Sequence, residues 1–333
     1  MAPTILILLG SAVVIYLACE FFVNGVEWLG HRFEVGQKAT GTILAAFGTA
    51  LPESVVTFVA VAFGGTAAQK QIGVGAALGG PLVLSTVAYA VVGWTLLAAR
   101  RPLKAATAAA DFRGLSRDQG WFLAIFVFKL AAGLFLFAFK PWLGVLFLAA
   151  YGAYVWQETR GSPGQGEAEG ELEPLKFAPK AEHPPTAMAV LQTVLALVVI
   201  FFASRLFVSQ IDSLGHALGL PSQFLALLLS PIATELPETL NAIIWIRQGK
   251  TRLALANISG AMMIQATVPT AFGLFFTPWM FDKALVTAGV VTLLAVIVLF
   301  VGFRSGRITR TWLSAMVGLY ALFAAVVVAL HLW

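Results

Sequence analysis

Long apolar runs are the feature that most restricts how this chain can fold. They recur along all 333 residues, and many of them reach 18 residues or more. In hydrocarbon every backbone polar group needs an internal partner, so a run of that length predicts a transmembrane α-helix. The runs are continuous and do not alternate as the strands of a membrane barrel do. Only 11% of the residues are charged, against about 25% in soluble domains. We therefore predict an all-α polytopic membrane protein.

Hydropathy divides the chain into ten predicted transmembrane helices. The first has no charged segment before it and no small-residue cleavage site after it, so we expect it to stay in the fold and not to act as a signal peptide. The fifth is short and the sixth is long. The approximate spans are 4–28, 39–63, 71–98, 120–138, 141–157, 187–215, 222–246, 252–275, 283–303 and 310–332.

Basic residues are distributed unevenly between the two sides that these spans define. The connections after the odd-numbered spans hold sixteen Lys and Arg residues, whereas the opposite side holds only Lys70, Lys140 and Lys283. Positively charged loops face the cytoplasm. We therefore predict a multi-pass protein of the cell membrane with both termini outside the cytoplasm.

The two halves of the chain repeat each other. A shift of 185 residues aligns Leu51-Pro52-Glu53 with Leu236-Pro237-Glu238. Each half holds five spans, and because five is odd the second copy enters the membrane from the opposite side. The sequence thus predicts two inverted five-helix repeats, 1–157 and 187–333, a plan that many secondary transporters use.

The two predicted repeats are joined by residues 158–186. This segment is rich in Gly, Pro and Glu and poor in apolar residues, so we expect a flexible cytoplasmic linker. Its glutamates allow two interpretations, a solvated tether between the halves or a regulatory cation site.

Each Leu-Pro-Glu copy places a carboxylate at a helix break inside an apolar span. Proline lacks a backbone donor, so carbonyls in the preceding turn lose their helical partners. Carbonyl, hydroxyl and carboxylate oxygens are hard ligands that suit Ca²⁺, Na⁺ or Mg²⁺. The first copy offers Thr49 and Glu53, and the second offers Thr234, Glu235 and Glu238. We predict a cation site near the middle of the membrane. The alternative, a proline kink with a buried neutral glutamate, does not explain why the pair is matched.

The two motifs resemble a known family signature. Gly-Thr-Ala-Leu-Pro-Glu at 48–53 and Ala-Thr-Glu-Leu-Pro-Glu at 233–238 are similar to the paired Gly-Thr-Ser-Leu-Pro-Glu repeats of the sodium/calcium exchanger family. The resemblance covers nearly the whole chain, including the ten spans and the central loop. It implies movement of Ca²⁺ against Na⁺ or H⁺.

The resemblance also implies roles for individual residues. The motif glutamates of the family bind Ca²⁺, which here means Glu53 and Glu238. The motif threonines supply hydroxyl or carbonyl oxygens, which here means Thr49 and Thr234.

The chain departs from the family in the spans that follow each motif. The family pattern Gly-Asn-x-x-Gly-Ser-Asn has lost every polar side chain at 75–81, and the second copy keeps Asn257 but has Ala-Met in place of the later Ser-Asn. Further on, where the family often has Asp or Asn, the two copies have Leu84 and Gln265. We therefore add Asn257 and Gln265 to the candidate ligands and expect the polar site to lie mainly in the second repeat.

The charge of this site bears on the choice of coupling ion. Glu53, Glu235 and Glu238 together could carry −3, and neighbouring like charges disfavour full ionisation. This favours coupling to H⁺ over a scheme with three Na⁺, but the residues leave both ions open. Glu235 is our candidate for the residue that carries a proton or balances charge.

The first and sixth spans are unusually polar. Glu20, Asn24 and Glu27 follow an i, i+4, i+7 spacing and share one helix face, and Arg205 is the repeat equivalent of Glu20. We expect Glu20 and Arg205 to pair near the pseudo-two-fold axis, because a paired charge is tolerated in a membrane. Such a pair could be a gate between the repeats or a static packing contact.

These features predict a secondary antiporter that exchanges Ca²⁺, or a related cation, for Na⁺ or H⁺ by alternating access. Its expected partners are the lipid bilayer and inorganic cations, with no cofactor. The net charge of +5 does not indicate nucleic acid binding, because the basic residues cluster between spans. A cation channel or a carrier for another cation is the alternative. An intramembrane enzyme is remote, because the chain has no HExxH or GxSxG pattern.

Overall fold

The computed structural model describes 2–32, 37–101, 103, 109–135, 139–161, 173–181 and 183–332. All regular secondary structure in these ranges is helical. Within them, the side chains that are not described are those of 30, 37–49, 109–111, 158–161, 232–233, 237 and 330–332.

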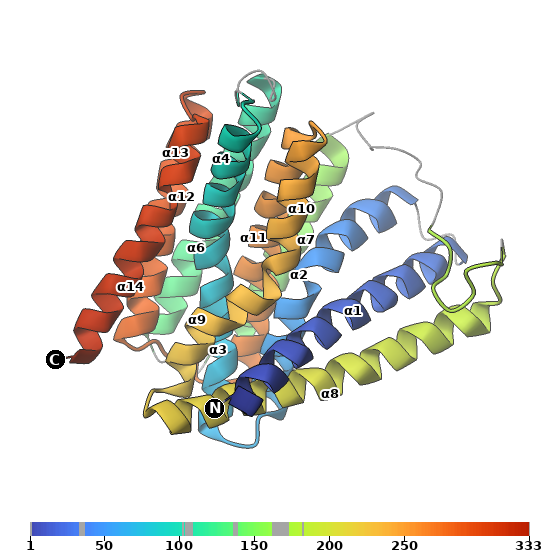
Figure 1. Cartoon of the computed structure of the whole chain (residues 1–333), viewed down its shortest axis with the longest axis horizontal. Coiled ribbons are helices and arrows are strands. Elements are labelled where there is room, and N and C mark those ends of the chain that lie inside the picture. The colour runs from blue at the N-terminus through green and yellow to red at the C-terminus, as the bar shows by residue number, and fades with distance from the viewer. Residues whose placement is uncertain are drawn as a thin grey trace.

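Successive helices make up both halves of the chain (Figure 1). The first half contains α1 (Ala2–Arg32), α2 (Gln37–Phe63), α3 (Ala67–Val83), the π-helical turn η1 (Leu84–Ala88), α4 (Tyr89–Ala98), α6 (Ala109–Leu134) and α7 (Lys140–Gly161). The second half contains α8 (Thr186–Leu218), α9 (Ser222–Thr234), α10 (Leu236–Arg247), α11 (Thr251–Phe276), α12 (Lys283–Arg304), α13 (Arg310–Ala315) and α14 (Val317–Leu332). The prediction of an all-α protein is confirmed for the described residues.

Six helical segments of the described chain are long and apolar enough to cross a membrane. They are Ala2–Leu29, Ala67–Ala98, Thr186–Leu218, Thr251–Phe276, Lys283–Arg304 and Arg310–Ala329. Helices also occupy most of the other four predicted spans. Helices α6 and α7 are more polar, α9 and α10 are each shorter, and α2 is assessed only from Ala50 onward because the side chains of 37–49 are not described. The count of ten spans therefore stays a prediction.

Helix boundaries differ most from the predicted spans at α6. It begins at Ala109, whereas the apolar run predicts a start near residue 120. The added turns include Arg113, Arg117 and Asp118. Hydropathy predicts only the part of a helix that lies in hydrocarbon. It does not detect polar turns by which the same helix extends into water.

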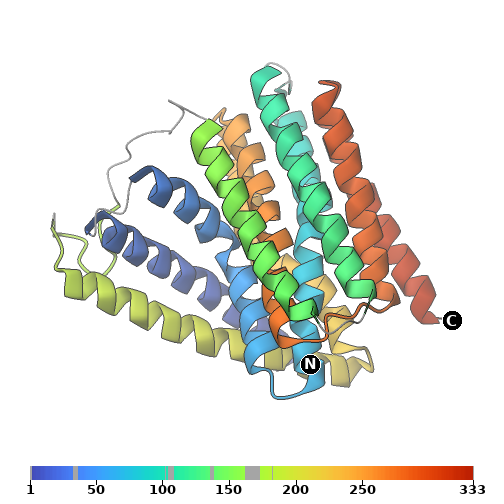
Figure 2. The ribbon, with the colours of Figure 1, turned by 180° about the vertical axis from the view of Figure 1, so that it is seen from behind.

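Helices α1 and α8 lie side by side and slant steeply against the bundle that contains α4, α6, α12 and α14 (Figures 1 and 2). At 31 and 33 residues they are about 46 and 50 Å long, which exceeds the roughly 30 Å of hydrocarbon and requires tilt. Only 28% of the most apolar stretch of α8 is buried inside the protein, whereas 83% of that of the central helix α11 is buried. The slanted pair therefore lies at the periphery, with one face available to lipid.

Buried apolar side chains form two separate clusters. One joins α1, α2, α8 and α9 around Ile15 and Phe207, and the other fills the bundle of the remaining helices around Tyr89 and Trp279. The division passes through α2 and α9, where neighbouring residues belong to different clusters. A boundary between two packed units is where one unit can move against the other.

Part of the predicted flexible linker is docked on the slanted pair, which corrects that prediction for 173–181. The backbone N–H of Lys176 donates to Asn24 Oδ1 at 3.0 Å, and the N–H of Phe177 donates to Gln192 Oε1 at 2.8 Å. Leu175 is fully buried. Composition did not reveal this docking, because backbone groups of 173–177 and one buried leucine make the contacts within an otherwise polar segment. Residues 162–172 lie outside the described part of the chain.

The two chain termini lie at the same end of the bundle in both views (Figures 1 and 2). The connections 64–66, 219–221 and 277–282 are at this end. The basic connections 248–250 and 305–309 are at the opposite end.

Helices α3 and α9, one from each half, pack with their backbones close together. A Cβ added at Gly79 would lie 2.5 Å from the carbonyl oxygen of Leu227 and 2.5 Å from Pro231 Cγ. Small residues allow such an approach between membrane helices, where packing rather than water exclusion drives association.

We expect Gly79→Ala to lower the free energy of unfolding by about 1–3 kcal/mol, because the backbone of α9 has to move. Gly152→Ala is the control, since nothing lies within 4 Å of its added Cβ. It should be neutral or stabilising by up to about 1 kcal/mol. Unfolding midpoints in detergent measure both, and equal stability of the two variants would contradict the close packing.

Candidate cation site

The helix break of the second motif positions three of the predicted residues. Helix α9 ends at Thr234 and α10 begins at Leu236, so Glu235 links them with φ −94° and ψ 1°. The N–H of Glu235 still donates to the carbonyl of Pro231, at 2.9 Å. Glu238 lies in the first turn of α10, where the helix dipole stabilises negative charge. In the first motif, by contrast, α2 continues as one helix through Pro52.

A hydrogen bond joins the two motifs directly. The Thr234 hydroxyl lies 2.5 Å from Glu53 Oε2 and 3.0 Å from the carbonyl oxygen of Ser230. It is also 3.4 Å from Glu235 Oε1. Residues 181 positions apart therefore share one buried polar cluster, with Glu53 from α2 and Thr234 from the end of α9.

Gln265 of α11 completes this cluster. Its side-chain Nε2 donates to Glu235 Oε1 at 2.7 Å. A Cβ at Gly80 would lie 2.5 Å from Gln265 Oε1 and 3.3 Å from Glu235 Oε1. Gly80 stands where the family pattern has Ser. The loss of a side chain on α3 thus makes room for the longer amide on α11.

The three carboxylates are withdrawn from water. Glu53 and Glu235 are 1% exposed and Glu238 is 0% exposed. Glu235 interacts electrostatically with both Glu53 and Glu238, so its own negative charge is opposed by two others. Such a cluster is costly in a low dielectric unless protons or cations balance it.

Some oxygens in this cluster are free to take a ligand. Glu53 Oε1, Glu235 Oε2 and Gln265 Oε1 are buried and have no hydrogen-bond partner among the described residues. The carboxylates are not gathered into a finished metal site, however. Within the described part of the chain, no three His, Cys, Asp or Glu side chains are close enough to hold a metal ion. The arrangement supplies hard oxygens that could converge on a cation after small side-chain movements.

Two predicted ligands are not placed in this cluster by the structure. The side chain of Thr49 lies outside the described residues. Asn257 is eight residues before Gln265 on α11, which is about 12 Å along the helix. Its Nδ2 atom is buried and has no hydrogen-bond partner in the described part.

The structure does not bring Glu20 and Arg205 together. Glu20 Oε2 pairs with Lys176 Nζ of the docked segment at 3.1 Å. The Arg205 guanidinium lies over the ring of Phe201, 5.9 Å from its centroid. Repeat equivalence predicted the pairing from symmetry, but Lys176 lies outside the repeats and is an available partner for the carboxylate.

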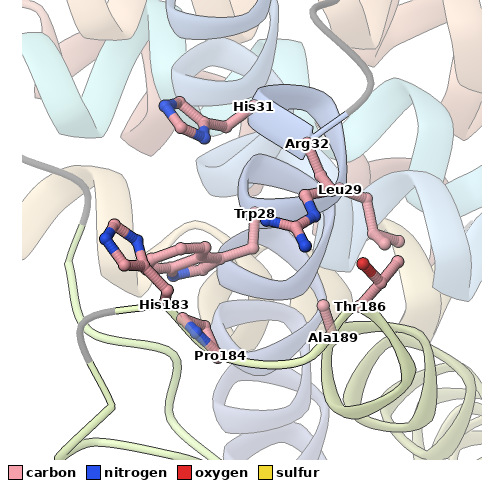
Figure 3. A pocket seen from close by; sticks show the side chains of 8 residues that line it. All are labelled: Trp28, Leu29, His31, Arg32, His183, Pro184, Thr186 and Ala189. Atoms are coloured by element: carbon pink, nitrogen blue, oxygen red, sulfur yellow. The ribbon is translucent and has the colours of Figure 1, made fainter.

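The pocket in Figure 3 lies away from the carboxylates, between the end of α1 and the start of α8. Trp28, His31 and Arg32 line it from α1, and His183 and Thr186 line it from the other side. None of the predicted cation ligands is among its lining residues.

The sequence alone did not reveal the contacts of one lysine beside the cluster. Lys129 of α6 is fully buried, and its Nζ donates to the backbone oxygen of Ala77 at 2.7 Å and of Gln265 at 3.2 Å. A lysine in the middle of a transmembrane span usually snorkels or pairs with another group. A signal was present in the prolines four residues after each of these carbonyls.

Known proteins match this chain over most of its length. The family model for the sodium/calcium exchanger protein matches 3–159 and 188–329. The candidate antiporter CaxA of Alkalimonas amylolytica is 26% identical over 317 residues, covering 93% of this chain and 92% of CaxA. The inner membrane protein YrbG of Escherichia coli is 26% identical over 306 residues, covering 89% of this chain and 87% of YrbG.

Two solved structures share the fold. The H⁺/Ca²⁺ exchanger CAX superposes with a TM-score of 0.66 at 15% identity, over 96% of this chain and 87% of CAX. The sodium-calcium exchanger NCX_Mj superposes with a TM-score of 0.58 at 18% identity, over 97% of this chain and 98% of NCX_Mj. With the family model matched across both halves, the chain belongs to the sodium/calcium exchanger family and is a cation/Ca²⁺ antiporter and not an enzyme.

Proposed function

We propose that this protein exchanges Ca²⁺, or a related divalent cation, for H⁺ or Na⁺ by alternating access. The observation that carries the proposal is the buried cluster shared by the two halves, in which Thr234 bonds to Glu53 and Gln265 bonds to Glu235. An ion in such a cluster is held by both halves, so relative movement of the helices changes its access to each side.

The proposed Ca²⁺ ligands are the carboxylates of Glu53 and Glu238, with oxygens from Thr49 and Thr234. Ca²⁺ takes six to eight oxygens, so further donors are needed. Glu235 and Gln265 supply them from the second half. Asn257 is the candidate that lies farthest from the cluster. To bind the ion, the Thr234 hydroxyl rotates its hydrogen away from Glu53 and presents its oxygen instead.

The proposed topology has ten spans in two inverted repeats with the termini outside the cytoplasm. It is supported by the position of the termini at one end and of the basic connections 248–250 and 305–309 at the other (Figure 1). The halves are 1–157 and 187–333. Residues 158–186 join them on the cytoplasmic side.

The proposed moving unit is the slanted pair α1 and α8. These helices belong to the smaller apolar cluster and are tied to each other by the bond from Gln192 Nε2 to Asn24 Oδ1, 3.0 Å long. Toward the rest of the molecule, Asp212 of α8 accepts from Gln69 Nε2 at 3.4 Å and from Ser222 Oγ at 2.7 Å. Sliding of the pair exposes the cluster to one side at a time.

We expect Glu53→Gln and Glu238→Gln each to reduce Ca²⁺ uptake into everted membrane vesicles to background. Each change removes a negative charge that balances the ion, with little change in shape. Glu27→Gln is the matched control, since this carboxyl lies near the end of α1 outside the cluster, and its uptake should stay within about twofold of the unmodified protein. Near-normal uptake by either cluster variant, at equal amounts of folded protein, would contradict the assignment of that glutamate as a Ca²⁺ ligand.

Glu235→Gln should flatten the pH dependence of Ca²⁺ flux. In the unmodified protein protons compete with Ca²⁺ for the carboxylates, so flux falls as the pH falls. A glutamine cannot take up a proton, so the variant loses that part of the fall. Initial rates of ⁴⁵Ca²⁺ uptake between pH 6 and 8 measure the effect in proteoliposomes. An unchanged profile would contradict a proton-carrying role for Glu235.

Cross-linking distinguishes movement of the slanted pair from a static pair. In a background with Cys19→Ala, cysteines at 69 and 212 tie α3 to α8, and a short bifunctional thiol reagent should stop exchange. Cysteines at 24 and 192 tie α1 to α8, which move together, so cross-linking there should leave exchange largely intact. Equal inhibition of both pairs, measured as ⁴⁵Ca²⁺ counterflow with cross-linking confirmed by mass spectrometry, would contradict sliding of α1 with α8.

A further inference from the structure

Lys129 is a buried cation without an anionic partner in contact. It lies in α6 with none of its side chain exposed, and no carboxylate within 4 Å of its Nζ is found among the described residues. Within the described part of the chain, its hydrogen bonds go to two backbone carbonyls, Ala77 on α3 and Gln265 on α11. The rings of Phe126 and Trp279 lie 5.4 and 5.9 Å from Nζ and add cation–π attraction.

The two carbonyls share a specific origin. In an α-helix the carbonyl of residue i accepts the N–H of residue i+4. Pro81 stands four residues after Ala77, and Pro269 stands four residues after Gln265. Proline has no N–H, so each of these carbonyls loses its regular helical donor. One ammonium group therefore satisfies two carbonyls that two prolines, one in each half of the chain, have released.

The two released carbonyls around the Lys129 ammonium resemble the ligands of a monovalent cation site. Released backbone carbonyls are the ligands that broken membrane helices offer to Na⁺ and similar ions. Here the position is taken by a cation that is covalently attached to the protein. Pro81 also stands where the family pattern of Gly-Asn-x-x-Gly-Ser-Asn has its last Asn, so the chain has exchanged a neutral ligand for a released carbonyl.

Lys129 is connected to the carboxylate cluster through a single residue. Gln265 accepts from Lys129 with its backbone oxygen and donates to Glu235 with its side chain. The ammonium also interacts electrostatically with Glu53. Its charge therefore adds to the charge of the cluster.

We propose that the Lys129 ammonium acts as a tethered cation that occupies the place of one exchangeable monovalent ion. The proposal deepens the proposed function and rests on it for its transport consequence. With a divalent ion bound and all four groups ionised, three carboxylates at −3 and one ammonium at +1 leave −2, which the ion balances. The protein then exchanges one Ca²⁺ for two monovalent cations, without net movement of charge.

The first test uses thermal unfolding in detergent and does not depend on transport. Lys129→Ala removes the charge and leaves space, whereas Lys129→Met removes the charge and fills the space. In N-methylglucamine chloride both variants should unfold at lower temperature than the unmodified protein. Added Na⁺, K⁺ or Li⁺ should raise the midpoint of Lys129→Ala in a saturable way, by roughly 5 °C beyond the response of the unmodified protein. Lys129→Met should show no such excess.

If neither variant responds to monovalent cations beyond the unmodified protein, Lys129 only satisfies the two carbonyls and the proposal is overturned. If both respond equally, the cations act elsewhere and the proposal is also overturned.

The second test uses the unmodified protein and decides the matter if Lys129→Ala does not fold. Proteoliposomes are held at 0 or −100 mV with K⁺ and valinomycin, and the final ⁴⁵Ca²⁺ gradient is measured at a fixed gradient of the coupling ion. Exchange without net charge gives the same Ca²⁺ gradient at both potentials. One net charge per cycle would change it by roughly 50-fold, which would overturn the proposal. Absence of any Ca²⁺ movement would instead refute the proposed function, and the unfolding test of Lys129 would still decide the tethered cation.

Discussion

The constraint that shapes this protein is the burial of negative charge where two halves of one chain meet. Glu53, Glu235 and Glu238 are withdrawn from water in a low-dielectric interior, where unbalanced carboxylates are costly. The bond from Thr234 to Glu53 and the bond from Gln265 to Glu235 hold the cluster across the boundary between the halves. A proton or a cation is needed to balance this negative charge. The unfavourable energy of the empty cluster therefore contributes to its affinity for the proposed ion.

Asymmetry between the two halves has a physical explanation in the packing of α3 against α9 and α11. The first copy of the family pattern is apolar because its glycines allow close approach. Gly79 faces the backbone of α9, and Gly80 faces the amide of Gln265. Polar ligands that are absent from α3 are replaced by a longer side chain from α11 and by carbonyls that prolines release. Local losses in one helix are therefore compensated by neighbours that are distant in sequence.

Division of the apolar core into two clusters supports the proposed movement of α1 and α8. The slanted helices α1 and α8 share one cluster, and the docked segment 173–181 is bonded to both of them. The carboxylates lie along the border of that cluster with the main bundle. A rigid pair beside a polar border can shift with little loss of packing, because apolar contacts within each unit are kept.

The sequence by itself determined the all-helical fold, the family and the three buried carboxylates. These follow from apolar run length and from a motif repeated at a fixed offset, which are local or periodic properties. It did not determine that α2 stays continuous at Pro52 while α9 and α10 separate at Glu235, that Glu20 pairs with Lys176, or that Lys129 caps two released carbonyls. Each of these depends on which partner lies nearest in space. Only the tertiary structure decides that, because buried donors and acceptors bond to whichever group the packing of distant helices brings within reach.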